Sequence, residues 1–252
     1  MVKLTIDTEN HTLTSEGQQI SLYSKEAFAL ISEIWLKMGW NAHYHYTFSW
    51  LGRPILQLPE DVMRLQEVIW ELRPDVIIET GVAFGGSLLF YASLCVLTAK
   101  GRVIGIDVDL HAQNREAITK HSLGSFISLI EGSSVDPEVF KRVSAQVKAR
   151  EKVCVILDAN HSKEHVLQEL HLYSKLVTKG SYIVVADGFK QCLTDVPRGK
   201  KEWAHDNPRA AVEEFLAAHP EFVLEYPERR YNRSDLRENV THFQSGWLRR
   251  MK

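Results

Sequence analysis

Five short apolar segments, each followed by an acidic residue, constrain the fold of this chain more than any other feature of its sequence. The acidic residues are Glu79, Asp107, Glu131, Asp158 and Asp187, and stretches with helical spacing separate the segments. Short apolar strands that alternate with helices are typical of a parallel, doubly wound sheet with helices on both faces. Because parallel strands end at the same edge, where such sheets bind ligands, the acids predict a ligand site there. We therefore predict an α/β fold with a functional carboxyl edge.

A glycine-rich turn follows the first apolar strand. In the stretch DVIIETGVAFGGS, residues 76–78 read as the strand, Gly81, Gly85 and Gly86 allow a tight turn, and Ser87 begins an apolar helix. A strand, a glycine turn and a helix N-terminus together present free backbone N–H groups to a ligand. The stretch is therefore a candidate binding site, although a purely structural turn would have the same pattern.

Position 83 distinguishes between two classes of ligand. A dinucleotide site requires the spacing G-x-G-x-x-G, whereas this chain has Ala83 at the middle position. A side chain there narrows the room for a diphosphate, and Glu79, two residues before Gly81, suits a ligand with an ammonium group. The turn resembles the first motif of S-adenosylmethionine-dependent methyltransferases, particularly the catechol O-methyltransferase type. An NAD-dependent oxidoreductase that uses the same turn is the alternative.

Composition and charge limit the partners of the chain. Its 252 residues, 44% of them hydrophobic, suffice for one α/β domain with appendages. The net charge of -2 leaves no basic footprint for nucleic acid, so we expect a small-molecule substrate. The apolar stretch 87–97 is shorter than the ~20 residues of a membrane span. Without a signal-peptide pattern, and with scattered cysteines, the sequence predicts a cytoplasmic location; a homo-oligomer is left open.

The first 58 residues are interpreted as an N-terminal extension and cap, and residues 59–252 as the main domain. The elements expected in the extension are a hairpin from Lys3–Ile6 and Gln18–Leu22, and a helix capped by Ser24 that extends to about Met38. The run His43–Trp50 (HYHYTFSW) could line a pocket, but aromatic runs more often pack a linker onto a domain, which is the interpretation that we favour.

The other expected elements continue the alternation of strands and helices. Helices are expected over Pro59–Leu72, Asn114–His121, Ser162–Leu176 and Arg209–Ala218, and another from Asp136–Pro137; strands are expected over Gly101–Asp107, Phe126–Ile130, Val153–Leu157 and Tyr182–Ala186, with a terminal pair near Phe222–Glu225 and Thr241–Trp247. Residues 191–208 form a polar loop long enough to be a substrate lid.

Each part of S-adenosylmethionine would need its own contacts in this sequence. The residues predicted to bind it are Glu79, Gly81, Gly85 and Ser87 for the amino-acid end, Asp107 for the ribose hydroxyls, and Ser133 and Ser134, with Gly132, for the adenine. Methyl transfer is an in-line displacement, so an enzyme chiefly positions the nucleophile and helps to remove its proton.

Asp158 and Asp187, which end neighbouring strands, are predicted to hold Mg²⁺, because hard carboxylate oxygens suit this ion. His161 is predicted to accept the proton of an acceptor hydroxyl, since the pKa of histidine lies near ~6.5. A role for His161 as a solvated helix N-terminal residue is the alternative. His161 and His165 also have zinc-like spacing, and with Asp158 they could form a non-haem iron site. The motif H-E-x-x-H is absent, however, and iron oxygenase sites usually lie inside a β-barrel.

From about His43 to the C-terminus, the chain resembles the cephalosporin hydroxylase family, which has the methyltransferase fold and includes rhamnosyl O-methyltransferases. The matching motifs are Trp50-Leu51-Gly52 with Pro54, Pro59-x-Asp61, Pro74 to Gly81, Gly85-Gly86-Ser87, Gly105-Ile106-Asp107, Gly132-Ser133-Ser134, Asp158-x-x-His161-Ser162-Lys163-x-His165-Val166, Gly180-Ser181-Tyr182, Asp187 and Gly246-Trp247-Leu248. The resemblance implies a class I, Rossmann-like methyltransferase domain, adenosylmethionine binding and metal-assisted O-methylation.

One position departs from the pattern of the family. The family usually has two adjacent acids after the fifth strand, and catechol O-methyltransferases have Ala-Asp-Asn, whereas this chain has Ala186-Asp187-Gly188. The catechol enzymes also have a catalytic lysine where His161 stands. Our prediction is an adenosylmethionine-dependent, Mg²⁺-assisted O-methyltransferase acting on a hydroxyl of a sugar or a natural-product-like molecule. Besides the oxidoreductase, a catalytically idle binding protein with the same fold is an alternative.

Overall fold

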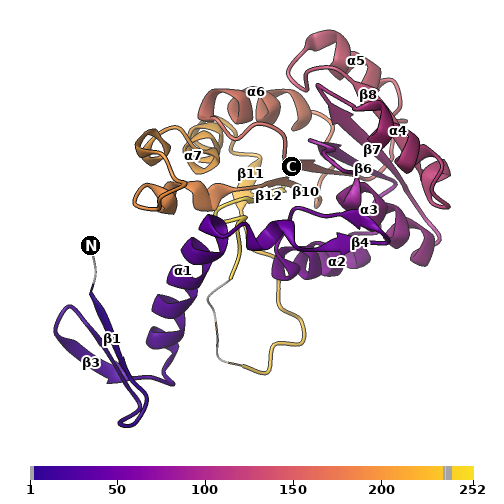
Figure 1. The fold of residues 1–252 in the computed structure, drawn as a ribbon. Coiled ribbons are helices and arrows are strands. Elements are labelled where there is room, and N and C mark those ends of the chain that lie inside the picture. The colour runs from indigo at the N-terminus through magenta and orange to yellow at the C-terminus, as the bar shows by residue number, and fades with distance from the viewer. Residues whose placement is uncertain (1–2, 235, 237–239) are drawn as a thin grey trace.

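The central sheet dominates the computed structural model, which describes residues 3–234, 236 and 240–252. Within these residues the sheet has seven strands in the order β11-β12-β10-β9-β6-β7-β8 (Figure 1). Their bounds are β6 (Val76–Thr80), β7 (Arg102–Asp107), β8 (Ile127–Glu131), β9 (Val153–Leu157), β10 (Tyr182–Val185), β11 (Phe222–Leu224) and β12 (Trp247–Arg250). β8, β7, β6, β9 and β10 are parallel, and β12 is antiparallel to both of its neighbours. The predicted mostly parallel sheet is confirmed.

Helices cover both faces of this sheet. One apolar cluster joins α2 (Pro59–Leu72), α3 (Gly86–Leu97) and α4 (Ala112–Thr119) to one face; the other joins α5 (Pro137–Ser144), α6 (Lys163–Tyr173) and α7 (Pro208–Ala218) to the opposite face. Along β6, Ile77 belongs to the first cluster, while Val76 and Ile78 belong to the second. Side chains alternate between the faces of a strand, so an uninterrupted apolar run is buried on both sides.

The N-terminal region differs from the expected hairpin. In this region β1 (Leu4–Asp7), β2 (Thr12–Ser15) and β3 (Gln18–Ser21) form an antiparallel sheet, and α1 (Lys25–Asn41) connects it to the rest of the chain. Figure 1 shows α1 extending away from the main sheet with β1 and β3 at its far end. The side chain of Ser24 accepts a hydrogen bond from the Ala27 amide, which confirms the predicted cap. The helix extends three residues beyond Met38.

Several short elements lie between the longer helices and strands. They are η1 (Tyr44–Tyr46), β4 (Ser49–Trp50) and β5 (Arg53–Pro54) before α2, and η2 (Gly124–Phe126) between α4 and β8. The predicted lid segment, residues 191–208, begins inside η3 (Gly188–Leu193) and contains η4 (Lys201–Ala204). It is therefore built of short helical turns.

The last strand begins later than predicted, at Trp247 rather than at Thr241. The segment before it is held by Asp61, whose carboxylate accepts hydrogen bonds from the Thr241 hydroxyl and from the His242 amide at 3.0 Å. Burial raises the pKa of Asp61 to about 7. These long-range contacts replace strand pairing in this segment. Among the described residues, no helix combines the length and the apolar character needed to cross a bilayer.

Candidate active site

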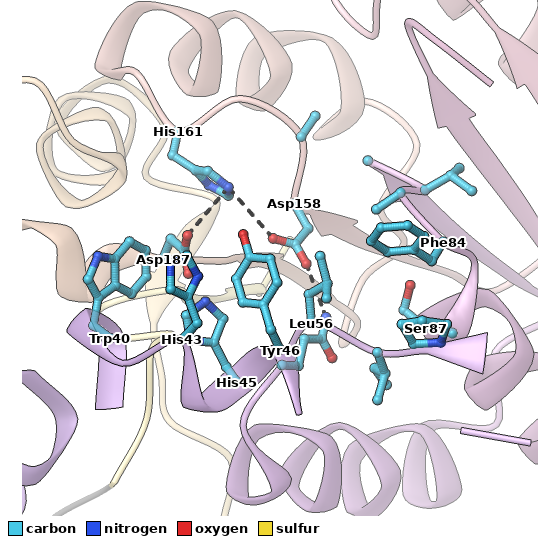
Figure 2. A pocket seen from close by; sticks show the side chains of 18 of the residues that line it. Trp40, His43, His45, Tyr46, Leu56, Phe84, Ser87, Asp158, His161 and Asp187 are labelled. Carbon is cyan, nitrogen blue, oxygen red and sulfur yellow. Dashed lines mark hydrogen bonds and ion pairs between the residues drawn. The ribbon is translucent and has the colours of Figure 1, made fainter. Parts of the chain in front are cut away.

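A cavity of about 400 Å³ lies at the carboxyl ends of β6, β9 and β10, where the order of the strands reverses. Its walls are formed by Trp40, His43, His45, Tyr46 and residues 54–57, by residues 81–84, Gly86 and Ser87, by Asp158, Ala159 and His161, and by Asp187, Lys190, Arg198 and Trp203. Figure 2 shows His161 and Asp158 on one side, with the aromatic side chains of the N-terminal segment facing them. The volume and the position are those of a small-molecule site in an α/β sheet.

The glycine turn packs directly against the segment that carries Asp158. Gly81 and Gly85 have φ values of +86° and +82°, which favour glycine. A Cβ atom at Gly81 would lie 2.1 Å from the carbonyl oxygen of Asp158, and one at Gly86 would lie 2.2 Å from that of Pro54. The absence of side chains therefore lets the turn, the β9 end and the N-terminal segment meet at the cavity.

Asp107 holds the conformation of the same turn. Its Oδ2 accepts hydrogen bonds from the amides of Val82 at 2.8 Å and Ala83 at 3.1 Å, and its Oδ1 accepts one from the Asp109 amide. Ala83 has φ +45°, an uncommon value for a residue with a side chain, and it lines the cavity. Asp107 itself is not among the lining residues, so its predicted contact with a ribose stays a prediction.

Glu79 lies behind the cavity wall rather than in it. The side chain is fully buried; the hydroxyls of Ser87 and Tyr91 donate to its two oxygens at 2.6 and 3.0 Å. Burial raises the pKa of Glu79 to about 8, so the group is mostly a neutral acid at pH 7. Ser87 lines the cavity and separates Glu79 from it.

Ser133 and Ser134, the predicted adenine contacts, also lie away from the lining residues. Ser134 is buried, with its Oγ 3.0 Å from Nε2 of His165, and its carbonyl accepts a hydrogen bond from Tyr173. His165 therefore contacts Ser134 instead of sharing a ligand set with His161. Among the described residues, no group of three or more His, Cys, Asp or Glu side chains is arranged to hold a metal ion.

The structure brings together the side chains of Asp158, His161 and Asp187, whose predicted roles stay predictions. The Nε2 atom of His161 lies 3.9 Å from Oδ1 of Asp158 and 3.4 Å from Oδ2 of Asp187. The three side chains retain 23, 19 and 17% of their surface, respectively, exposed toward the cavity. β9 and β10 are adjacent parallel strands, with Leu157 paired to Val185, so the residues that follow them emerge side by side.

The two carboxyl groups have opposite electrostatic surroundings. For Asp158, burial and the negative charges of Asp187 and Glu79 raise the pKa well above its ordinary value. For Asp187, burial acts in the same direction, but His161 and other neighbouring basic groups outweigh it and lower the pKa. Burial also lowers the pKa of His161, although Asp187 opposes this effect. At neutral pH, Asp187 is therefore the charged carboxylate beside a neutral imidazole.

Gln57 is a site residue that the sequence analysis missed. It is buried, and its Nε2 donates a hydrogen bond of 3.1 Å to Oδ2 of Asp158. Its Oε1 atom is buried without a hydrogen-bond partner within the described structure. Gln57 comes from the loop before α2, where no motif marks it. Only the packing of this loop against the end of β9 reveals its role.

The aromatic run His43–Trp50 forms part of the cavity wall, against the interpretation that we favoured. His43, His45 and Tyr46 line the cavity, with the ring of His45 stacked on Trp40 at 5.2 Å. Trp50 does pack onto the main domain, at 5.0 Å from the ring of Phe90. The run therefore packs onto the main domain and also lines the cavity. The alternation of histidine and tyrosine in the sequence was the signal for the part that lines the cavity.

Comparison with known families gives one extensive match. A family model described as Rhamnosyl O-methyltransferase/CmcI matches residues 42–251. The rhamnosyl O-methyltransferase of Mycobacterium leprae is 32% identical over 143 residues, which cover 56% of this chain and 60% of the relative. That of Mycobacterium tuberculosis H37Rv is 30% identical over 141 residues, covering 55% of this chain and 56% of the relative. The matches thus span less than two thirds of these relatives.

Solved structures show the same fold at lower sequence identity. One described as cmcI-D160 Mg-SAM has a TM-score of 0.54 and 22% identity, and covers 82% of this chain and 78% of its own. An O-methyltransferase from Bacillus cereus in complex with SAH has a TM-score of 0.51 and 15% identity, and covers 79% and 90%. Both share the Rossmann-like arrangement of the central sheet.

Proposed function

Because the chain belongs to the rhamnosyl O-methyltransferase/CmcI family, we propose that it transfers the methyl group of S-adenosylmethionine to a hydroxyl of a small-molecule acceptor. The observation that carries the proposal is the position of His161, which faces Asp158 and Asp187 in the cavity beside the glycine turn. In this reaction the hydroxyl oxygen forms a bond to the methyl carbon while the carbon–sulfur bond breaks. The protein must align the two reactants and accept one proton.

The glycine-turn side of the cavity is the proposed cofactor side. α3 begins there at Gly86, and its N-cap Gly85 provides no side-chain cap. The amides of Gly81 and Gly85 already donate to the carbonyls of Ile106 and Val82, so these glycines shape the turn. The N-terminus of a helix favours a carboxylate, and we therefore assign the methionine carboxylate to the backbone amides of Gly86 and Ser87, which line the cavity. Glu79 beneath Ser87 is the proposed partner of the ammonium group, whose charge would favour the ionised form of this acid.

The rest of the cofactor is assigned to residues beyond the cavity lining. Asp107 is partly exposed and is the proposed acceptor for the ribose hydroxyls, in addition to holding the turn. Ser133 and Ser134 are the proposed adenine contacts. Because Ser134 is already bonded to His165, its backbone is the more suitable donor. A structure with bound S-adenosylhomocysteine would test these assignments directly.

Asp158 and Asp187 are the residues that would hold Mg²⁺. This ion often takes one or two carboxylates, with water and substrate oxygens completing six-fold coordination, so a pair of acids fits it. The pKa of Asp158 is raised partly by Asp187, and a cation would relieve this repulsion. A similar solved structure, of CmcI, is described with Mg and SAM. When bound, Mg²⁺ would lower the pKa of the acceptor hydroxyl.

His161 is the proposed general base. Burial lowers its pKa, so the imidazole is neutral at physiological pH and can accept the hydroxyl proton. The charged carboxylate of Asp187, 3.4 Å away, would then stabilise the imidazolium. Asp158, at 3.9 Å, orients the acceptor together with Gln57. The relatives named rhamnosyl O-methyltransferase favour a sugar hydroxyl as the acceptor.

Calorimetric titration of the purified protein with S-adenosylmethionine, S-adenosylhomocysteine and NAD tests the cofactor assignment. We expect both adenosyl compounds to bind and NAD not to bind. If neither adenosyl compound binds at millimolar concentration, the proposal is wrong, and binding of NAD alone would favour the oxidoreductase.

Methylation of a panel of rhamnosides and related glycosides then separates an enzyme from an idle binding protein. The variant His161→Gln should bind S-adenosylhomocysteine normally but form at least about 100-fold less methylated product, a loss typical of a missing general base. The control His171→Gln alters an exposed histidine of α6, the helix that follows His161; it lies outside the cavity lining and should retain activity. A wild-type protein that binds the cofactor and methylates no acceptor would support the idle protein.

A further inference from the structure

Two cationic side chains, Lys190 and Arg198, line the cavity without a carboxylate partner. They come from the segment after β10 and not from the glycine turn, so we place them on the acceptor side of the cavity. Neither forms an ion pair with an acidic side chain in the part of the chain that the structure describes. Instead, the Nζ atom of Lys190 lies 4.7 Å from the centroid of the Trp203 ring. Such a cation–π contact does not neutralise the charge of the ammonium group.

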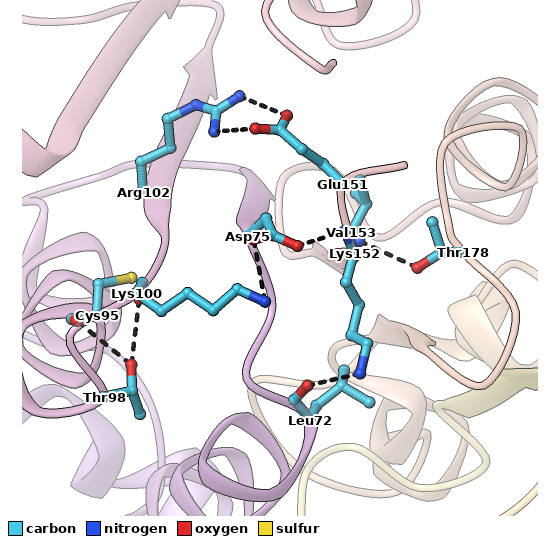
Figure 3. Close-up of polar contacts among 10 residues, drawn as sticks. All are labelled: Leu72, Asp75, Cys95, Thr98, Lys100, Arg102, Glu151, Lys152, Val153 and Thr178. Atoms are coloured by element: carbon cyan, nitrogen blue, oxygen red, sulfur yellow. Dashed lines mark hydrogen bonds and ion pairs between the residues drawn. The ribbon is translucent and has the colours of Figure 1, made fainter. Parts of the chain in front are cut away.

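Cations at the opposite edge of the sheet are paired, as Figure 3 shows. Arg102 binds both carboxylate oxygens of Glu151 at 2.8 Å, and Lys100 lies 3.0 Å from Asp75. The ammonium group of Lys152 donates to the Leu72 carbonyl at 3.0 Å. These three basic side chains have acceptors, whereas none is found for Lys190 and Arg198 in the part of the chain that the structure describes.

Local structure fixes both cations at the cavity. Lys190 lies three residues after Asp187 in η3, one 3-10 turn further along, and its amide bonds to the Asp187 carbonyl. Arg198 precedes Gly199, whose amide bonds to the Val196 carbonyl at 2.8 Å. A Cβ atom at Gly199 would lie 1.7 Å from the Leu193 carbonyl oxygen, so the turn that presents Arg198 is tightly packed.

The acids of the cavity do not pair with its cations. Apart from histidines, the charged lining residues are Asp158, Asp187, Lys190 and Arg198. Asp158 accepts a hydrogen bond from Gln57, and Asp187 lies 3.4 Å from His161, so the close contacts of both acids are with residues other than the two cations. Burial lowers the pKa of the half-buried Lys190, although Asp187 opposes this effect, so the ammonium group has lost hydration without gaining an ion pair.

We propose that the acceptor carries an anionic group, a carboxylate or a phosphate, in addition to the hydroxyl that is methylated, and that Lys190 and Arg198 bind this group. The inference rests on the proposed methyl transfer and identifies the class of acceptor. The guanidinium of Arg198 suits two-point binding of either anion, whereas Lys190 acts as a point charge. The acceptor hydroxyl then lies toward His161, and the anion toward the lid segment.

Titration of the protein loaded with S-adenosylhomocysteine tests the proposal with three probes: D-glucuronate, D-glucose 6-phosphate and neutral D-glucose. At least one anionic probe should bind about tenfold or more tightly than glucose, a difference of about 1.4 kcal/mol. The two anionic arms distinguish a carboxylate from a phosphate. Equal binding of all three probes, or no binding of either anion, would overturn the proposal.

Variants locate the anion. Lys190→Met and Arg198→Met should each reduce the preference for the anionic probe, and the double variant should bind it no better than glucose. Lys201→Met changes an exposed lysine of η4 outside the cavity lining and should leave the preference unchanged. Affinity for S-adenosylhomocysteine, measured first for each variant, reports folding and the cofactor site separately. If the double variant still prefers the anionic probe to glucose, the assignment of the anion to Lys190 and Arg198 is refuted. If the wild-type protein does not bind S-adenosylhomocysteine, the proposed function is refuted instead.

Discussion

Replacement of Glu79 by glutamine tests whether a neutral acid lies beneath the glycine turn. Glu79 is fully buried between the hydroxyls of Ser87 and Tyr91, and burial raises its pKa from 4.5 to about 8. Glutamine has the same shape as protonated glutamic acid and also combines donor and acceptor groups. Glu79→Gln should therefore preserve the packing and remove only the titration.

The raised pKa makes the stability of the wild type depend on pH. Because the folded protein binds this proton more tightly than the unfolded chain, the contribution of Glu79 is complete below pH 4.5 and is lost as the pH rises through about 8. Each pKa unit corresponds to about 1.36 kcal/mol, so the total loss is at most about 5 kcal/mol. Between these limits the free energy of unfolding should fall by about 1.4 kcal/mol per pH unit through this group alone.

Urea unfolding of both proteins from pH 5.5 to 7.5 measures the difference. The free energy of unfolding of the wild type, minus that of Glu79→Gln, should decrease by about 1.4 kcal/mol per pH unit, as other titrating groups cancel. Glu164→Gln, which alters an exposed glutamate of α6, should show the wild-type slope. If the free energies of unfolding of the wild type and of Glu79→Gln changed with pH in parallel, the conclusion that Glu79 is a neutral acid would be refuted.

Three further predictions concern the residues around the cavity. Gly81→Ala should destabilise the fold by ~3 kcal/mol or more and abolish binding of S-adenosylhomocysteine, because its Cβ would lie 2.1 Å from the Asp158 carbonyl oxygen. Gly17→Ala, with a similar φ of +82° in open space, should cost only about 1 kcal/mol in urea unfolding; equal losses would contradict this reasoning. Methyl transfer should persist as the pH falls below 6.5, because burial lowers the pKa of His161 and the base must be neutral; a pH–rate profile whose acid limb lies above 6.5 would exclude this role. Asp187→Asn should move that limb to lower pH and weaken Mg²⁺ binding about tenfold or more, as measured by calorimetry; unchanged affinity would remove Asp187 from the metal site.

Elements with a strong local pattern were predictable from the sequence. The helix Pro59–Leu72 and the strand Val153–Leu157 have the predicted bounds, because an apolar run or stripe coincides with clear boundary signals. β2 was missed because its sequence, TLTS, is mostly polar and only Leu13 is fully buried. β12 was misplaced because the bonds of Asp61 to the preceding segment join residues far apart in the sequence. The domain boundary after residue 58 stays a prediction.

The sequence also predicted the sheet edge at which the structure has its cavity, but not all the residues that cover this edge. Parallel strand order brings Asp158 and Asp187 together, and His161 follows within three residues, so local pattern and topology were sufficient there. Gln57 and His45 belong to the N-terminal segment, and only tertiary packing places that segment over the edge. Glu79 lies one residue before the end of β6, near the predicted position, but its side chain is enclosed behind Ser87, which no spacing rule reveals.

The two acids that follow β9 and β10 are similarly placed in the topology but differ in chemistry. Asp158 is largely enclosed and lies near the negative charges of Asp187 and Glu79, which favours its protonated form. Asp187 lies near His161 and Lys190, which favour its charged form. A divalent cation that binds both carboxylates would therefore compete with protons mainly at Asp158, whose pKa is raised, rather than at Asp187, whose pKa is lowered. It follows that cation affinity increases with pH, and that the neighbours of each acid, rather than its position at a strand end, determine its part in the reaction.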